Sequence, residues 1–95
     1  MKTILFYWSR GAETRREIVL IIAECERLGE PCYLNMIAEK IKLTHVAAKK
    51  HVDLLIEEKY IKVLNPGGKP NYLALDENGI EILKELNSEK QKGKS

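Results

Sequence analysis

The sequence is poor in several kinds of residue, and each shortage excludes a class of protein. Its 95 residues include only 2 cysteines, too few for the disulfide framework of a small secreted domain. No apolar run approaches the roughly 20 residues of a membrane-spanning helix, and none resembles a signal peptide, so we expect a cytoplasmic protein without membrane contact. The net charge of +2 is too small for a protein that coats nucleic acid by charge alone.

Motifs for catalysis and for metal binding are also missing. The sequence shows no carboxylate pair and no nucleophile with a neighbouring base at an informative spacing. Gly67-Gly68-Lys69 lacks the first glycine and the final hydroxyl residue of a phosphate-binding loop. The soft metal ligands are limited to Cys25, Cys32, His45 and His51. We therefore expect no enzyme, no metal site, no cofactor and no small-molecule substrate.

The two cysteines allow two interpretations. Cys25 and Cys32 can approach each other across a turn at Gly29, which would permit a redox switch. Buried cysteines also serve simply as small apolar side chains. The sequence leaves both interpretations open.

Residues 33–60 carry the strongest local signal, two short helices separated by a turn. Apolar residues recur at helical spacing on both sides of Lys42-Leu43, which we expect to form a tight connection. Thr44 can accept a hydrogen bond from the first turn of the second helix, so we expect it to be the N-cap. The pattern predicts a helix-turn-helix with its second helix at residues 44–58. The apolar positions are Leu34, Ile37, Ala38 and Ile41 in the first helix and Ala48, Val52, Leu55 and Ile56 in the second.

The outward face of this second helix is rich in hydrogen-bond donors. It carries His45, Lys49 and Lys50, together with Val46 and Asp53. Between Lys40 and Lys50 the chain has four lysines and one histidine but no acid. Lysines on an amphipathic helix often form only a solvated face. Their concentration here favours a recognition helix that contacts phosphates and base edges in a major groove.

The N-terminal third of the chain contains more apolar surface than one covered face needs. Residues 1–11 form an apolar and aromatic segment, which either contacts a second subunit or covers the first helix. That helix is predicted at Ala12–Leu28, with Gly29 as its left-handed end. Its apolar residues extend almost around it, which indicates a central position or a subunit contact.

The C-terminal half predicts a β-hairpin followed by a helix. Two β-prone runs flank residues 65–70, a loop rich in glycine and proline with Lys69 at its tip. Such a loop can contact an adjacent minor groove or can be a plain surface hairpin. Cys32-Tyr33 is expected to be a short extended piece that pairs with this hairpin. Asp76 is expected to cap a last helix that ends near Asn87, and residues 88–95 to form a frayed polar tail.

This order of elements resembles the winged helix-turn-helix regulators of archaea and bacteria, of the ArsR-like and MarR-like types and the small dimeric archaeal type. The resemblance covers about Glu13 to Leu86, and residues 12–87 are expected to form one domain. It implies an α+β winged helix, with a three-helix core, a β-hairpin wing and a C-terminal helix. The segments that carry it are Thr14–Ile18, Ile37–Thr44, Lys50–Glu58 with Tyr60-Ile61, and Tyr72–Gly79.

The resemblance also implies roles for individual residues. The expected DNA-binding residues are Thr44, His45, Lys49 and Lys50 on the recognition helix, Lys42 before it and Lys69 on the wing. His51 matches a histidine that is structural in ArsR-like proteins. Lys59 stands where these families place a glycine, so either the helix ends differently or Lys59 adopts a strained left-handed conformation. The wing lacks the arginine that such proteins often carry there.

The function expected from these features is sequence-selective binding of double-stranded DNA by a homodimeric transcriptional regulator. A winged-helix module for protein–protein interaction, without specific DNA binding, is the alternative. Non-specific coating of DNA is disfavoured by the small net charge. Lysine and glutamate occur 12 times each and glutamine once, a bias that points to a thermophilic, archaeal source.

Overall fold

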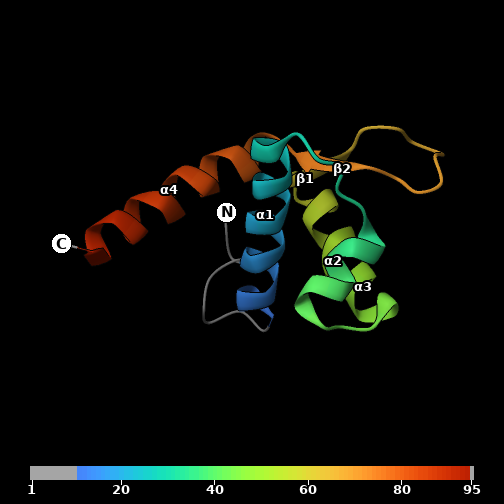
Figure 1. The fold of residues 1–95 in the computed structure, drawn as a ribbon, viewed down its shortest axis with the longest axis horizontal. Helices are drawn as coiled ribbons and strands as arrows, with labels where there is room; N and C mark the ends of the chain where they lie inside the picture. Colours follow the sequence, from blue (N-terminus) through green and yellow to red (C-terminus); the bar gives the residue numbers. More distant parts are fainter. Residues whose placement is uncertain (1–10, 95) are drawn as a thin grey trace.

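The computed structural model describes the backbone of residues 11–94 and the side chains of residues 11–86. It contains four helices and a two-stranded antiparallel hairpin, which confirms the predicted α+β winged helix (Figure 1). The elements are α1 Ala12–Leu28, α2 Leu34–Ile41, α3 His45–Glu57, β1 Ile61–Val63, β2 Leu73–Leu75 and α4 Glu77–Lys94. The predicted subunit contact of residues 1–11 lies, apart from Gly11, outside the described residues. Within residues 11–94, no helix combines the length and the apolar character needed to cross a membrane.

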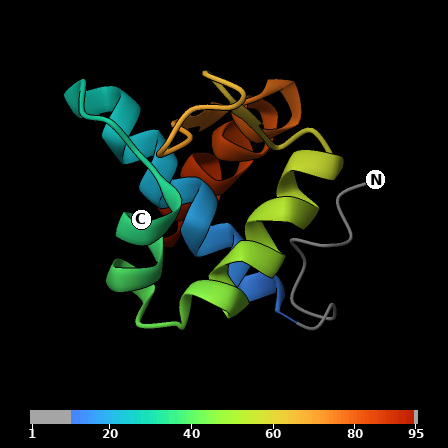
Figure 2. The same ribbon diagram turned by 90° about the vertical axis from the view of Figure 1, so that its right-hand side faces the viewer.

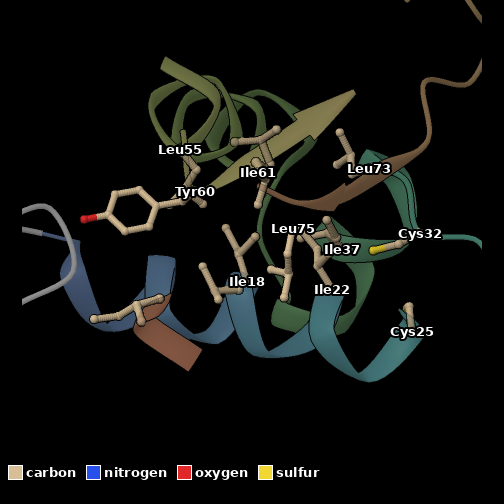
Figure 3. Packing of buried hydrophobic residues seen from close by; sticks show 13 residues of the cluster. Ile18, Ile22, Cys25, Cys32, Ile37, Leu55, Tyr60, Ile61, Leu73 and Leu75 are labelled. Atoms are coloured by element: carbon tan, nitrogen blue, oxygen red, sulfur yellow. The ribbon is translucent and has the colours of Figure 1, made fainter. Parts of the chain in front are cut away.

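Helix α1 is the centre of the domain, since it contacts α2, α3, α4 and β2. Figure 1 shows α2 and α3 on one side of α1, while α4 leaves the body on the other side. The core lies between these elements, and Figure 3 shows its buried side chains from close by. It consists of Ile18, Val19, Ile22, Cys25, Cys32, Ile37, Val52, Leu55, Tyr60, Ile61, Leu73, Leu75 and Ile82. The central position of α1 explains the burial of Val19 beside the main apolar stripe, whereas Leu20 and Leu28 are exposed.

Helices α1, α2 and α3 all end in the same hydrogen-bonded turn. In each, one residue in the left-handed conformation reverses the chain, and the next N–H donates to a carbonyl five residues earlier. The reversing residue is Gly29 in α1 (φ 71°), Lys42 in α2 (φ 60°) and Lys59 in α3 (φ 63°). Of the two possibilities at Lys59, the structure therefore shows the strained left-handed conformation. The core contact of Tyr60, which follows at once and is 1% exposed, holds it there.

The hairpin pairs β1 with β2 in the register Ile61↔Leu75 and Val63↔Leu73. A bridge between Tyr33 and Tyr72 extends it, which confirms the predicted short extended piece. The Leu73 N–H donates to the Cys32 carbonyl at 2.8 Å. The segment between α1 and α2 is therefore attached to the base of the wing.

Helix α4 begins as predicted but ends later. The Asp76 carbonyl accepts the Ile80 N–H at 3.0 Å, which places Asp76 at the N-cap position, and its Oδ1 accepts the adjacent Glu77 N–H at 2.8 Å. The prediction of an end near Asn87 with a frayed tail was wrong, because the helix continues to Lys94. Glutamate, lysine and glutamine, which are common after residue 87, are good helix formers and explain the extension.

Candidate nucleic-acid interface

The buried side of α3 is made of the apolar residues that the sequence indicated. Ala48, Val52 and Leu55 are buried and hold α3 against α1 and α2. The Thr44 hydroxyl oxygen accepts a hydrogen bond from the Ala47 N–H at 3.1 Å, which confirms Thr44 as the N-cap. With one side fixed in the core, the opposite side of α3 faces solvent.

The exposed side of α3 carries most of the predicted site residues. Thr44, His45, Lys49 and Lys50 are all exposed, and Lys42 is exposed in the turn just before them. Val46, which is 67% exposed, adds an apolar side chain to the first turn of the helix. This surface offers positive charge, hydrogen-bond donors and one apolar contact from a single rigid element.

A groove between α3 and the wing brings together residues that are distant in the sequence. It encloses about 340 Å³. His45 and Lys49 line it from α3, and Lys69 lines it from the wing. In Figure 2 the hairpin loop lies at the top of the view, with α2 and α3 below it. Of the six predicted site residues, three therefore share one groove, whereas Lys42, Thr44 and Lys50 do not line it. Apolar side chains that line the same groove include Leu34, Val52, Ile56, Val63 and Leu73.

Lys49 makes an ion pair that was not predicted from the sequence. Its Nζ lies 2.7 Å from Asp53 Oδ2, one helical turn away, and the two side chains are 58% and 56% exposed. The spacing of four residues was a usable signal for this pair. An exposed pair of this kind contributes only about 0.3–0.5 kcal/mol, so Lys49 can exchange Asp53 for a phosphate. Lys50 makes no ion pair with any residue that the structure describes.

Asn65 organises the wing, although the sequence analysis gave it no role. Its Oδ1 accepts a hydrogen bond from the Tyr72 N–H at 2.7 Å, and its Nδ2 donates to the Pro70 carbonyl at 3.1 Å. Its own carbonyl accepts from the Gly68 N–H at 2.8 Å. Asparagine is common in turns for this reason, and its place at the start of the loop was the available signal. These bonds hold the two ends of the loop together and limit where Lys69 can lie.

His51 is partly buried and contacts α1. Arg15, which is 5% exposed, lies with Nη1 3.2 Å from His51 Nδ1. An arginine can only donate, so Nδ1 accepts and the ring proton is assigned to Nε2. Burial lowers the pKa of His51, and the charge of Arg15 lowers it further. Burial also lowers the pKa of Arg15. The contact ties α3 to α1, in agreement with the structural role that the resemblance implies.

Gly11 covers this contact at the start of α1. A Cβ atom at Gly11 would lie 2.8 Å from His51 Cε1 and 2.9 Å from Arg15 Nη1, and the φ angle of 79° also favours glycine. The histidine and arginine therefore belong to the packing of α1 on α3. Among residues 11–86, no group of three or more histidine, cysteine, aspartate or glutamate side chains is arranged to hold a metal ion.

Comparison with known proteins relates the chain to bacterial regulators by structure alone. No protein-family model and no curated protein sequence matches it. A mutant of Lactococcus lactis ZitR in apo form aligns with a TM-score of 0.70 at 24% identity, over 85% of this chain and 59% of that chain. A MepR mutant from a multidrug-resistant S. aureus clinical isolate aligns with a TM-score of 0.74 at 13% identity, over 85% of this chain and 58% of that one.

Another solved structure is wild-type ZitR in complex with DNA. It aligns with a TM-score of 0.65 at 25% identity, over 83% of this chain and 52% of the other. ZitR is described as a zinc-responsive member of the MarR family. These neighbours are winged-helix transcription regulators, so the comparisons agree with the fold described above. The chain spans between about half and three-fifths of the length of the structures that it matches.

Proposed function

We propose that this protein is a transcriptional regulator that binds double-stranded DNA sequence-selectively as a homodimer. In this proposal α3 enters a major groove and the wing contacts the adjacent backbone. The observation that carries the proposal is the convergence of His45 and Lys49 on α3 with Lys69 on the wing at one groove. Two elements that present cations side by side match a surface of closely spaced phosphates.

The individual roles follow from position and chemistry. Lys42, Lys50 and Lys69 are exposed cations that would bind phosphates and so position the protein. His45 and Val46 begin α3, where a recognition helix contacts base edges, and Val46 suits the methyl group of thymine. The Thr44 hydroxyl, already the acceptor for Ala47, keeps its own proton to donate to a phosphate.

The solved complex of ZitR with DNA supports this proposal, because a neighbour with the same fold binds DNA. A homodimer would place two copies of α3 in successive major grooves, about 34 Å apart. Exposed apolar side chains away from α3, among them Leu20 on α1 and Ile80 on α4, offer surface for a subunit contact. The alternative, a protein–protein interaction module, would use such surface without specific DNA binding.

The proposal is tested by replacing Lys49 and Lys50 together with alanine. Each phosphate contact contributes about 0.9 to the slope of log affinity against log salt concentration, so the slope should fall by about 1.8 per chain. Affinity at low salt should fall at least tenfold. The measurement is a salt series of binding titrations with duplexes selected from a random library. The matched control replaces Lys62 on β1 and Lys84 on α4 with alanine, since both are exposed lysines on other elements. It should change the slope and the affinity less than the test pair does.

Two outcomes would contradict the proposal. The first is an affinity and a salt slope that the double substitution leaves unchanged. The second is the absence, at ~0.15 M salt, of any wild-type complex that resists competitor DNA, because specific complexes typically exceed non-specific ones by at least ~10³ in affinity. That second result would favour the protein–protein interaction module.

A further inference from the structure

The two cysteines form a pair that the proposed DNA-binding function does not use. We propose that Cys25 and Cys32 close an intramolecular disulfide bond when a low-molecular-weight disulfide is present as oxidant. The bond would join the last turn of α1 to the segment that pairs with β2. This inference does not depend on the proposed function.

The packing of the chain places the two cysteines in the same part of the core. Cys25 is 5% exposed and Cys32 is 2% exposed, and both belong to the same core cluster (Figure 3). The influence of Cys25 on the pKa of Cys32 agrees with two neighbouring thiols. The turn at Gly29 reverses the chain between them, and the Glu30 N–H donates to the Cys25 carbonyl at 2.8 Å. Since the chain contains no other cysteine, only one pairing within the chain is possible.

The proposed bond would connect α1 to the base of the wing. The Cys32 carbonyl accepts the Leu73 N–H at 2.8 Å. The next residue, Tyr33, forms the bridge to Tyr72, and their rings meet edge to face with centroids 6.2 Å apart. Fixing Cys32 to Cys25 therefore limits separation of β2 from α1.

The proposed oxidant would approach from the side of Cys32. Cys32 lines an open groove of about 600 Å³ between the end of α1, the hairpin and α4, which Glu26, Glu30 and Ile80 also line. The Cys32 thiolate would attack one sulfur of the oxidant, break its S–S bond and release one thiolate. The Cys25 thiolate would then attack Cys32 Sγ and release the second. The two protons of the cysteines pass to the two released thiols, so the chain is oxidised and the oxidant reduced.

Burial makes this reaction slow at neutral pH. Burial is the main cause that raises the pKa of Cys32 to about 12, and the neighbouring Cys25 thiol is the second cause. The thiolate is the attacking form, so the initial rate of closure should rise roughly tenfold for each pH unit between about 7 and 9. Near pH 7 the pair would stay reduced unless exposure to the oxidant is long.

The test uses the full chain, reduced and then freed of reductant. The chain is incubated with hydroxyethyl disulfide at pH ~9, and the reaction is then quenched with acid. Remaining thiols are alkylated in denaturant, and the mass of the intact chain is measured by mass spectrometry. We expect the wild-type chain to lose two hydrogen atoms, to accept no alkyl group and to stay monomeric on a non-reducing gel. Cys25→Ser and Cys32→Ser, the matched controls, should instead retain a hydroxyethyl adduct or an alkyl group.

Thermal unfolding supplies a second measurement on the same material. Closure of a short loop should raise the unfolding midpoint of the wild-type chain by roughly 5–15 °C, and added reductant should reverse the rise. Three results would overturn the proposal. The first is a chain whose two thiols are both alkylated, under conditions that fully oxidise dithiothreitol in a control sample. The second is a disulfide bond between two chains instead of within one. The third is a lower unfolding midpoint after oxidation.

Discussion

Asp53 limits the affinity of α3 for DNA if the proposed function holds, and Asp53→Asn should therefore bind DNA more tightly than the wild type. The carboxylate has two unfavourable effects. It holds Lys49, with its Oδ2 2.7 Å from the lysine nitrogen. It also places a negative charge on the face of α3 that would approach phosphates. The asparagine keeps the size of the side chain and removes the charge.

The magnitude follows from these two effects. In the wild type, breaking the exposed ion pair to free Lys49 for DNA costs about 0.3–0.5 kcal/mol, and Asp53→Asn removes this cost. Repulsion between a carboxylate and a phosphate roughly 6 Å apart in water is about 0.7 kcal/mol, and screening at ~0.15 M salt reduces it to about 0.3 kcal/mol. The sum of about 0.6–0.8 kcal/mol corresponds to roughly threefold to fourfold tighter binding for each recognition helix.

Fluorescence anisotropy titration with a duplex selected from a random library would measure this change. Glu30→Gln, which removes the same charge at the end of α1, is the control and should leave the affinity unchanged. The unfolding midpoint of Asp53→Asn should fall by only about 2–4 °C, because the lost pair is exposed. An affinity equal to or below that of the wild type would refute the reasoning. It would indicate that the face of α3 that carries Asp53 does not contact DNA.

Three further predictions concern the wing, the end of α3 and the response to acid. Asn65→Ala removes two side-chain hydrogen bonds that limit the position of Lys69, so DNA affinity should fall about threefold to tenfold in the same titration. An affinity equal to that of the wild type would exclude this bracing role. Lys59→Gly should raise the free energy of unfolding by about 0.5–1 kcal/mol by relieving the left-handed strain, whereas Lys59→Ala should not, as denaturant titration can show. Since burial and Arg15 lower the pKa of His51, its contribution to stability is present above about pH 6.5 and is lost as the pH falls through the lower folded-state pKa. Denaturant titrations between about pH 7 and 5 should show a smaller loss of unfolding free energy in His51→Gln than in the wild type. An equal loss in both would show that His51 does not cause it.

The sequence alone determined the elements whose signals are local. The N-cap at Thr44 and the buried stripe of Ala48, Val52 and Leu55 depend on residues within one or two helical turns. The turn after α1 depends in the same way on Gly29. For this reason the starts of the helices, the hairpin and the exposed cationic side of α3 were all correctly predicted. The pair between Lys49 and Asp53 was equally local and could have been predicted from its spacing.

Only the tertiary structure decided which distant residues meet. The groove shared by His45 and Lys69 and the contact of Arg15 with His51 both depend on how separate elements pack. Residue types and periodicity state which side of an element is buried. They do not state the path of the backbone between elements, and the distances between side chains of different elements follow from that path.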